Sequence, residues 1–164
     1  MLTAAVRTGP KGAAGRQAEK DMSKTFLVGI DGSEEATRAA RHAAGLAKDL
    51  GARLILLHVI DWSGFEHLDV ESLAERHRDK EREVKKATAE ILEPAAAALG
   101  GGLDLELKVM HGHVAEQMAW LAREREVDGV FVGRRGRGRF ASLVLGSVSL
   151  SLVQACDRPL TVVP

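Results

Sequence analysis

The sequence predicts an α/β domain, an open sheet of five parallel strands with helices on both faces. Five short apolar runs alternate along the chain with four segments whose apolar residues recur at helical spacing. Such alternation is typical of parallel sheets whose connecting helices cover both faces. The first, second and fourth apolar runs are continuous, which favours strands buried on both sides. The length of 164 residues fits one domain with its own core.

The first strand and the first helix have clear boundaries. An apolar run over 25–30 ends at Asp31-Gly32, and Ser33 is a good N-cap followed by two acidic residues. Gly51 closes the helix. The stripe expected to face the sheet consists of Ala36, Ala39, Ala40, Ala43, Leu46, Ala47 and Leu50.

A second buried strand is expected over 53–60, and a long helix over about 70–99. The first half of that helix, residues 75–86, is almost entirely charged, which indicates a solvated face. Pro94 should kink or divide the helix, because proline removes one backbone donor. The glycines at 100–102 end it.

The second half of the chain supplies three more strands. Residues 103–110 alternate leucine or valine with charged residues, as an edge strand with one polar face does. A helix over 114–125 leads to a buried-looking strand over 129–132. A helix over 146–156 and a strand over 160–163 complete the alternation.

Composition weighs against several classes of function. The 23 Lys and Arg residues balance the 23 Asp and Glu residues, and the few aromatics are scattered, so a nucleic-acid surface is not expected. No apolar run reaches the roughly 18 residues of a membrane helix. The single cysteine, Cys156, is interpreted as a buried, inert thiol in a reducing cytoplasm. Residues 1–22 lack the apolar core of a secretory signal and precede a domain over 23–164. They are interpreted as a disordered extension or as a mis-assigned start with Met22 as the true beginning, with a mitochondrial presequence as the weaker alternative.

A glycine-spaced loop joins the fourth strand to the last helix. It reads Gly133-Arg-Arg-Gly136, nine residues, and then Gly146-Ser147. A loop of this kind at a helix N-terminus has the outline of a phosphate site, because backbone N–H groups and the helix dipole favour an anion there. Glycine permits close approach and positive φ. The lysine of a Walker loop is absent. Positive charge comes instead from Arg134, Arg135, Arg137 and Arg139.

Each feature also has a simpler interpretation. The glycine loop could be a flexible turn whose arginines only solubilise it. Asp31 could cap the first helix rather than meet a ligand. His58 lies in a buried strand and is interpreted as a hydrogen-bonded core histidine. The pair His111 and His113 has a spacing that invites a metal interpretation, but no carboxylate or cysteine partner stands nearby in sequence, so no metal site is predicted.

Together these residues resemble the universal stress protein family, over nearly all of 23–164. The resemblance is carried by Val28-Gly-Ile-Asp-Gly-Ser33, His58-Val-Ile60, the loop spacing G-x2-G-x9-G-[ST], and Cys156-Asp-Arg-Pro159 with the final strand. That loop spacing marks the family's nucleotide-binding branch. The resemblance implies a Rossmann-like sheet in the order 3-2-1-4-5 and a site for ATP, ADP or AMP, with or without Mg²⁺. It also implies a homodimer paired through the last strands, Leu160 to Val163.

The resemblance further implies roles for single residues. Asp31 would face the ribose or the adenine, and the backbone of Val59 would meet the adenine edge. Gly133, Gly136, Gly146 and Ser147 would form the phosphate loop. The candidate ligand-binding residues are Gly29, Ile30, Asp31, Val59, Gly133, Arg134, Gly136, Arg137, Gly138, Gly146, Ser147, Val148 and Ser149, with no catalytic residue and no metal ligand among them.

Three functions follow as hypotheses. The first is an ATP-binding stress or signalling protein whose nucleotide occupancy sets conformation or choice of partner. The second is a slow ATPase or phosphotransferase, for which no convincing general base stands near the loop, so weak turnover at most is expected. The third is a partner-binding module with an incidental nucleotide, in which the charged segment 75–86 is the contact surface.

Overall fold

The computed structural model describes residues 23–61, 73–136 and 145–164. The disorder predicted for residues 1–22 lies outside these ranges. The predicted sheet is confirmed: five parallel strands in the order β3-β2-β1-β4-β5. Its strands are β1 (Thr25–Gly29), β2 (Arg53–Ile60), β3 (Asp104–His111), β4 (Gly129–Gly133) and β5 (Leu160–Val163).

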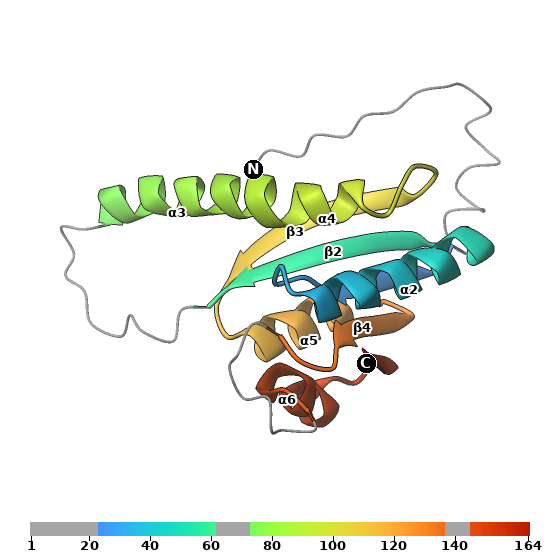
Figure 1. Ribbon diagram of the computed structural model, residues 1–164. Coiled ribbons are helices and arrows are strands. Elements are labelled where there is room, and N and C mark those ends of the chain that lie inside the picture. Colours follow the sequence, from blue (N-terminus) through green and yellow to red (C-terminus); the bar gives the residue numbers. More distant parts are fainter. Residues whose placement is uncertain (1–22, 62–72, 137–144) are drawn as a thin grey trace, which may run out of the picture.

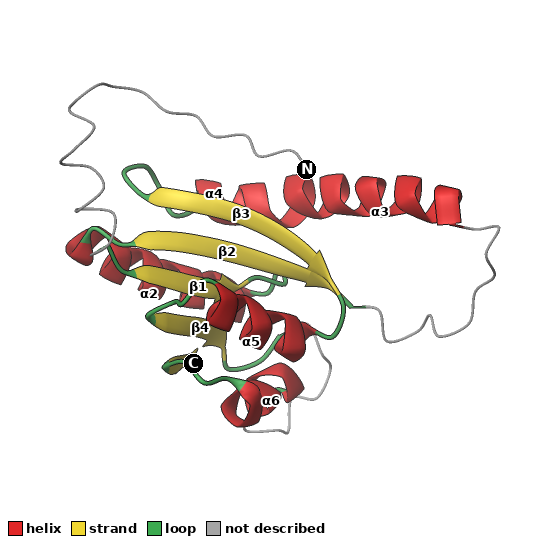
Figure 2. Ribbon diagram, turned by 180° about the vertical axis from the view of Figure 1, so that it is seen from behind, coloured by secondary structure: helices red, strands yellow, loops and turns green. Residues whose placement is uncertain are grey.

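Helices cover both faces of the sheet, as Figures 1 and 2 show from opposite sides. One face is covered by α2, α3 and α4, and the other by α5 and α6. No helix in the described ranges is long and apolar enough to cross a membrane. The helical elements are α2 (Glu34–Leu50), α3 (Leu73–Ala87), a π-helical turn η2 (Thr88–Leu92), α4 (Glu93–Ala97), α5 (Val114–Glu124) and α6 (Ser147–Ala155).

Helix α2 has the predicted caps. The Ser33 hydroxyl accepts the Ala36 N–H at 3.1 Å, and Gly51 adopts the left-handed conformation that ends the helix, with φ of 63°. The alanines of the predicted stripe are buried, and small side chains let the helix lie close to β1 and β4. The prediction was wrong for Leu46 and Leu50, which are 36% and 53% exposed. Leu46 lies at the margin of the alanine stripe, and Leu50 is the last residue of the helix.

The long helix is interrupted before Pro94 rather than at it. The Glu93 N–H donates to the Thr88 carbonyl, which makes the preceding turn a π-turn. Pro94 then falls in the first turn of α4, where its missing donor costs little. The predicted start near residue 70 lies outside the described residues, whose helix begins at Leu73.

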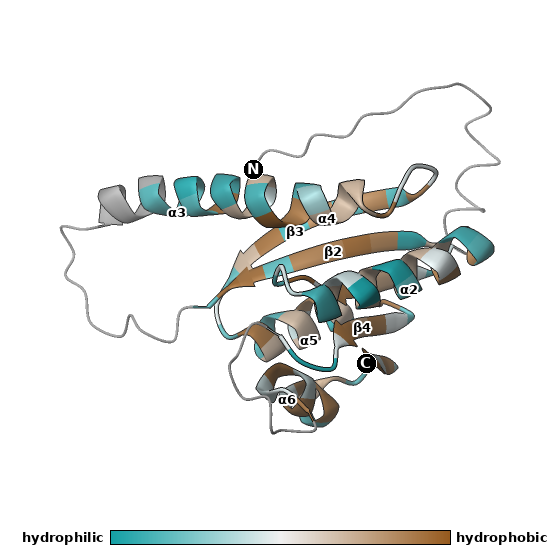
Figure 3. Ribbon diagram, viewed as in Figure 1, coloured by the Kyte–Doolittle hydropathy of each residue, from teal (hydrophilic) through white to brown (hydrophobic). Residues whose placement is uncertain are grey.

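Two apolar cores lie on either side of the sheet. Side chains of successive strand residues alternate between them, so Leu56 joins the core under α2 while Leu57 joins the core under α5. The predicted edge strand is confirmed, because among the described strands β3 pairs with β2 alone, and its leucines face the first core. Figure 3 shows the contrast between apolar strands and the hydrophilic helix α3.

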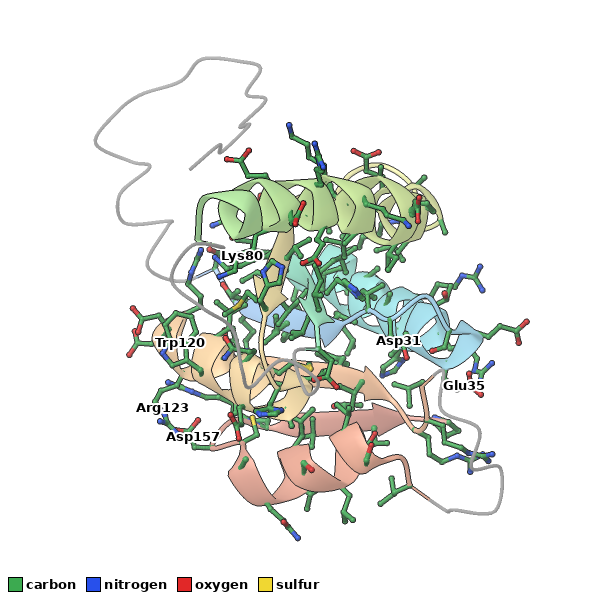
Figure 4. The ribbon with its side chains drawn as sticks, turned by 90° about the vertical axis from the view of Figure 1, so that its left-hand side faces the viewer. Asp31, Glu35, Lys80, Trp120, Arg123 and Asp157 are labelled. Carbon is green, nitrogen blue, oxygen red and sulfur yellow. The ribbon has the colours of Figure 1, made fainter. Side chains whose placement is uncertain are left out.

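An ion pair joins α5 to the turn before β5. The Arg123 Nε donates to Asp157 Oδ2 at 2.9 Å, and Figure 4 shows the two side chains together near the exposed Trp120. This hydrogen bond, with the charge of Arg123, lowers the pKa of the Asp157 carboxyl. The pair therefore contributes to stability above the ordinary carboxyl pKa, and the contribution is lost as pH falls through the lowered, folded-state pKa.

The variant Arg123→Gln is expected to raise the pKa of Asp157 toward the ordinary aspartate range. Its effect on the melting temperature at pH 7 should be small, because the pair is exposed to solvent. NMR titration of the Asp157 carboxyl measures the change. Arg125→Gln is the control, since Arg125 pairs with Glu106 and should leave the Asp157 titration where it was.

Candidate functional site

A cavity of about 440 Å³ opens at the carboxyl ends of the strands. The loops after β1 and β4 both reach it, which confirms the prediction that these loops flank one crevice. In open parallel sheets this is where ligands bind, because the crossovers leave the sheet in opposite directions there. The lining residues are Gly29, Ile30, Asp31, Ala36, Leu57, His58, Val59, Val114, Met118, Val132, Gly133, Arg135, Gly136, Gly146, Ser147, Val148 and Ser149.

Of the candidate residues that the structure describes, all but Arg134 line this cavity. The candidates Arg137 and Gly138 lie outside the described residues. Sequence reasoning missed the apolar wall formed by Val114 and Met118 of α5. One signal was available, because α5 begins three residues after the carboxyl end of β3, where a helix must rise beside the same edge.

Gly29 makes room for the apolar wall. A Cβ atom at this position would lie 2.8 Å from the Met118 Cε and 2.9 Å from its sulfur. The methionine therefore packs directly over the end of β1. Together with Val114 and Val132 it gives one side of the cavity the apolar surface that a flat heterocycle requires.

The backbone of Val59 faces the cavity beyond the end of β1. The Leu57 carbonyl accepts the Ile30 N–H at 2.8 Å, so the peptide groups of Leu57 point toward β1. In a parallel strand, the N–H and C=O of one residue point to one neighbouring strand, and those of the next residue point to the other. Val59 lies two residues after Leu57, so its N–H and C=O also point to the β1 side. No backbone hydrogen bond joins Val59 to the chain after β1 among the described residues. The Val59 side chain packs in the second core, and Val59 also lines the cavity.

Asp31 belongs to the turn that starts α2, and it also lines the cavity. Its Oδ1 accepts the Ser33 N–H at 2.9 Å and the Ser33 hydroxyl at 2.6 Å. The Ser33 hydroxyl in turn accepts the Ala36 N–H. Both predicted roles, turn residue and cavity residue, are thus compatible with its position (Figure 4). At the N-terminus of α2, the Ser33 side chain thus caps the Ala36 N–H.

The N-terminus of α6 is open. Its N-cap, Gly146, has no side chain to cap the helix, and the N–H groups of Ser147, Val148 and Ser149 have no intrahelical acceptor. These residues line the cavity. The Gly146 N–H donates to the Arg134 carbonyl at 2.9 Å, which fixes the helix start against the end of β4. The helix dipole and amides that have no acceptor among the described residues therefore meet the cavity at one point.

The glycines of the loop are required by space rather than by positive φ. Positive φ is found elsewhere in the described chain, at Gly32 for example, and not at Gly133, Gly136 or Gly146. A Cβ on Gly133 would lie 2.7 Å from the Glu35 carbonyl carbon, and one on Gly136 would overlap the Asp31 carboxylate. The expectation of positive φ was wrong for these glycines, and their close approach to a pyrophosphate stays a prediction.

Two residues predicted to contact phosphate, Ser149 and Arg134, form hydrogen bonds to other groups of the protein. The buried hydroxyl of Ser149 donates to the Gly133 carbonyl at 2.9 Å and so holds the loop to α6. The Arg134 N–H donates to the Val163 carbonyl at 2.7 Å, and its side chain lies outside the cavity lining. Arg135 is the described arginine that lines the cavity.

The histidines have different roles. His58 is partly buried, donates from Nδ1 to the Ile30 carbonyl at 2.7 Å and also lines the cavity. His111 contacts Glu83 at 3.0 Å, and His113 lies 4.0 Å from Asp61, so neither belongs to the described cavity lining. Within the described ranges no three His, Cys, Asp or Glu side chains gather closely enough to hold a metal.

Fold and site together define a doubly wound α/β domain with a ligand-sized cavity where the strand order reverses. The model of the universal stress protein family matches residues 22–164, and the chain belongs to that family. Universal stress protein YxiE of Bacillus subtilis is 34% identical over 151 residues, covering 87% of this chain and 99% of that protein.

Solved structures with this fold include the hypothetical protein MJ0577, with a TM-score of 0.73 and 26% identity over 87% of this chain and 96% of that one. A universal stress protein in complex with cAMP has a TM-score of 0.58 and 24% identity, over 86% of this chain and 97% of that one.

Proposed function

We propose that this protein binds an adenine nucleotide in the cavity, with the base between Met118 and the Val59 backbone and the phosphates at the start of α6. The observation that carries the proposal is the contrast between two helix N-termini at one cavity. The start of α2 has a side-chain cap from Ser33, whereas the start of α6, which lines the cavity with Arg135, has no side-chain cap among the described residues. Charged oxygens are the ligands that the amides of such a helix start favour.

The rest of the cavity fits the same ligand. Its apolar wall suits a base, and the open N–H and C=O of Val59 suit the mixed donor and acceptor edge of adenine. The fold is shared with a universal stress protein solved with cAMP. We further propose that ATP, accompanied by Mg²⁺, is the ligand, and that occupancy sets conformation or choice of partner in a stress or signalling response.

Native mass spectrometry and thermal shift test the binding. The protein as purified should carry, or take up, one equivalent of ATP. At a ligand concentration of 100 Kd, ATP should stabilise the fold by about 2.7 kcal/mol, which raises the melting temperature by about 5–10 °C. Tripolyphosphate and adenosine should each give a smaller shift. No shift with ATP, ADP or AMP would leave a partner-binding module as the better explanation.

The variant Arg135→Gln is expected to weaken ATP binding by about tenfold and AMP binding by less. The reason is that a hydrogen bond to a charged group contributes about 1.5–3 kcal/mol and most of the phosphate charge is on the tail. Titration calorimetry measures both constants. Arg41→Gln is the control, because Arg41 is an exposed arginine of α2 outside the cavity. Equal losses for ATP and for adenosine would contradict the assignment.

We also propose a homodimer through the edge of β5. This strand pairs with β4 alone among the described strands, so one of its edges is unpaired. Leu150 and Val153 of the neighbouring helix α6 are 51% and 58% exposed. An open edge beside exposed apolar side chains suits a two-fold contact between copies of the chain.

Val153→Glu is expected to convert the dimer to a monomer in sedimentation velocity, because a charge at a buried interface cannot be solvated. Leu50→Glu is the matched control, since Leu50 is equally exposed but ends α2. A dimer that survives Val153→Glu and dissociates with Leu50→Glu would place the contact elsewhere.

A further inference from the structure

We infer that His58 keeps the backbone N–H of Val59 open for the ligand, by occupying the carbonyl group that this N–H would otherwise bond. The inference rests on the proposed function, because it concerns how the adenine edge is met. It makes His58 a positioning residue whose side chain acts through the main chain next to it.

The register of the sheet identifies the bond that is missing. Gly29 pairs with Leu57, which places Ile30 opposite His58. The Ile30 N–H donates to the Leu57 carbonyl at 2.8 Å, as the parallel ladder requires. The next bond in that ladder would run from the Val59 N–H to the Ile30 carbonyl. Within the described residues this bond is not formed, although β2 itself continues to Ile60.

The Ile30 carbonyl is taken by a side chain instead. Its oxygen lies 2.7 Å from His58 Nδ1. A carbonyl oxygen only accepts, so Nδ1 must carry the proton, which fixes the tautomer of the neutral ring. The ring that blocks the ladder belongs to the residue directly opposite Ile30 and directly before Val59. On this inference, the hydrogen bond from His58 turns the Ile30 carbonyl away from the Val59 N–H. The parallel ladder between β1 and β2 then ends where the cavity begins.

The two main-chain groups of Val59, its N–H and its carbonyl, can together recognise one edge of a base. The N–H can donate to a ring nitrogen, and the carbonyl can accept from an exocyclic amine on the same edge of a base. Adenine presents this pair of groups. A 6-oxo purine presents a carbonyl and a ring N–H in their place, so the same peptide would oppose both. Closing the Val59 N–H onto Ile30 would remove half of this recognition.

Amide hydrogen exchange of the unliganded protein tests the inference first. In the wild type the Val59 N–H should exchange at least about tenfold faster than the N–H of Leu57. In His58→Leu the ladder bond should form, and the Val59 N–H should become about tenfold more protected. In His58→Asn the amide nitrogen replaces Nδ1, so exchange should stay at the wild-type rate. A Val59 N–H that is already protected in the unliganded wild type would overturn the inference.

Affinity gives the second readout. His58→Leu should weaken ATP binding by about 5–10-fold, the equivalent of one hydrogen bond, and leave tripolyphosphate binding unchanged. It should also reduce the preference for ATP over inosine triphosphate. His58→Asn should remain within about twofold of the wild type. His42→Leu is the control, since His42 is an exposed histidine on the same side of the sheet, outside the cavity.

The outcomes separate the inference from the proposed function. Equal loss of ATP and tripolyphosphate binding in His58→Leu would mean that the histidine only supports the fold, and the inference would be wrong. A wild type that binds no ATP would refute the proposed function, while the exchange experiment would still decide the role of His58. If the leucine variant does not fold, His58→Gln replaces it. The glutamine amide nitrogen lies one bond farther from the main chain than His58 Nδ1, so it should miss the Ile30 carbonyl and behave as leucine does.

Discussion

Replacing Gly136 by valine is expected to weaken ATP binding severely while the domain stays folded. A Cβ atom at Gly136 would overlap the Asp31 Oδ2, and both residues line the cavity. Over-packing a site costs about 1–3 kcal/mol, which corresponds to about 5- to 150-fold in affinity. We expect the upper end, because the approach of phosphate to the main chain is blocked as well. Calorimetry with ATP measures the loss.

The fold should survive because the obstacle is a side chain. Gly136 is exposed, and the carboxylate of Asp31 can turn away from an added methyl group. The melting temperature of Gly136→Val without nucleotide should therefore stay within about 3 °C of the wild type. If ATP binds this variant with unchanged affinity, the phosphate loop has been assigned to the wrong residues.

Replacing Gly133 by alanine is expected to destabilise the whole domain. The added Cβ would lie 2.7 Å from both the carbonyl carbon and the Cβ of Glu35, and 2.9 Å from the nitrogen of Ala36. These are mostly main-chain atoms of the first turn of α2, which cannot move without shifting the helix from the sheet. A loss of about 2–3 kcal/mol follows, or about 5–10 °C in melting temperature by calorimetry.

Gly45→Ala is the matched control for that variant. Gly45 lies inside α2, is exposed, and has no atom within 4 Å of an added Cβ. The same chemical change should here raise stability by about 0.5–1 kcal/mol, because alanine is the better helix former. Two glycine-to-alanine changes should thus have opposite signs. A Gly133→Ala protein as stable as the wild type would show that α2 does not rest on the end of β4.

Most of the fold was predictable because its signals are local. The order of strands and helices, the Ser33 cap and the Gly51 ending depend on residues that are neighbours in the chain. The π-turn at Thr88–Leu92 was not predictable in the same way. Proline gives a clear signal for a lost donor, but the exact turn that absorbs the loss depends on how the helix packs on β2 and β3.

The parts of the candidate site that consist of main chain alone were predictable from the sequence. The glycine spacing located Gly133, Gly136 and Gly146, because any side chain there would meet another segment. The contribution of Met118 could not be read from its helix, where it has the spacing of an ordinary core residue. The hydroxyls of Ser147 and Ser149 look alike in sequence. Only the packing of α6 on β4 directs the second of them to the Gly133 carbonyl.

A single residue, Arg134, connects the cavity to the rim of the sheet through its two main-chain groups. Arg134 gives its N–H to Val163, the last residue of β5, and accepts the N–H of Gly146, the first cap of α6. The proposed nucleotide binding and the proposed dimer contact would therefore act on the main chain of the same residue. If either event shifts Arg134, each must alter the equilibrium of the other by an identical factor, since linkage between two binding events is reciprocal. Measuring dimer dissociation with and without ATP would give that factor directly.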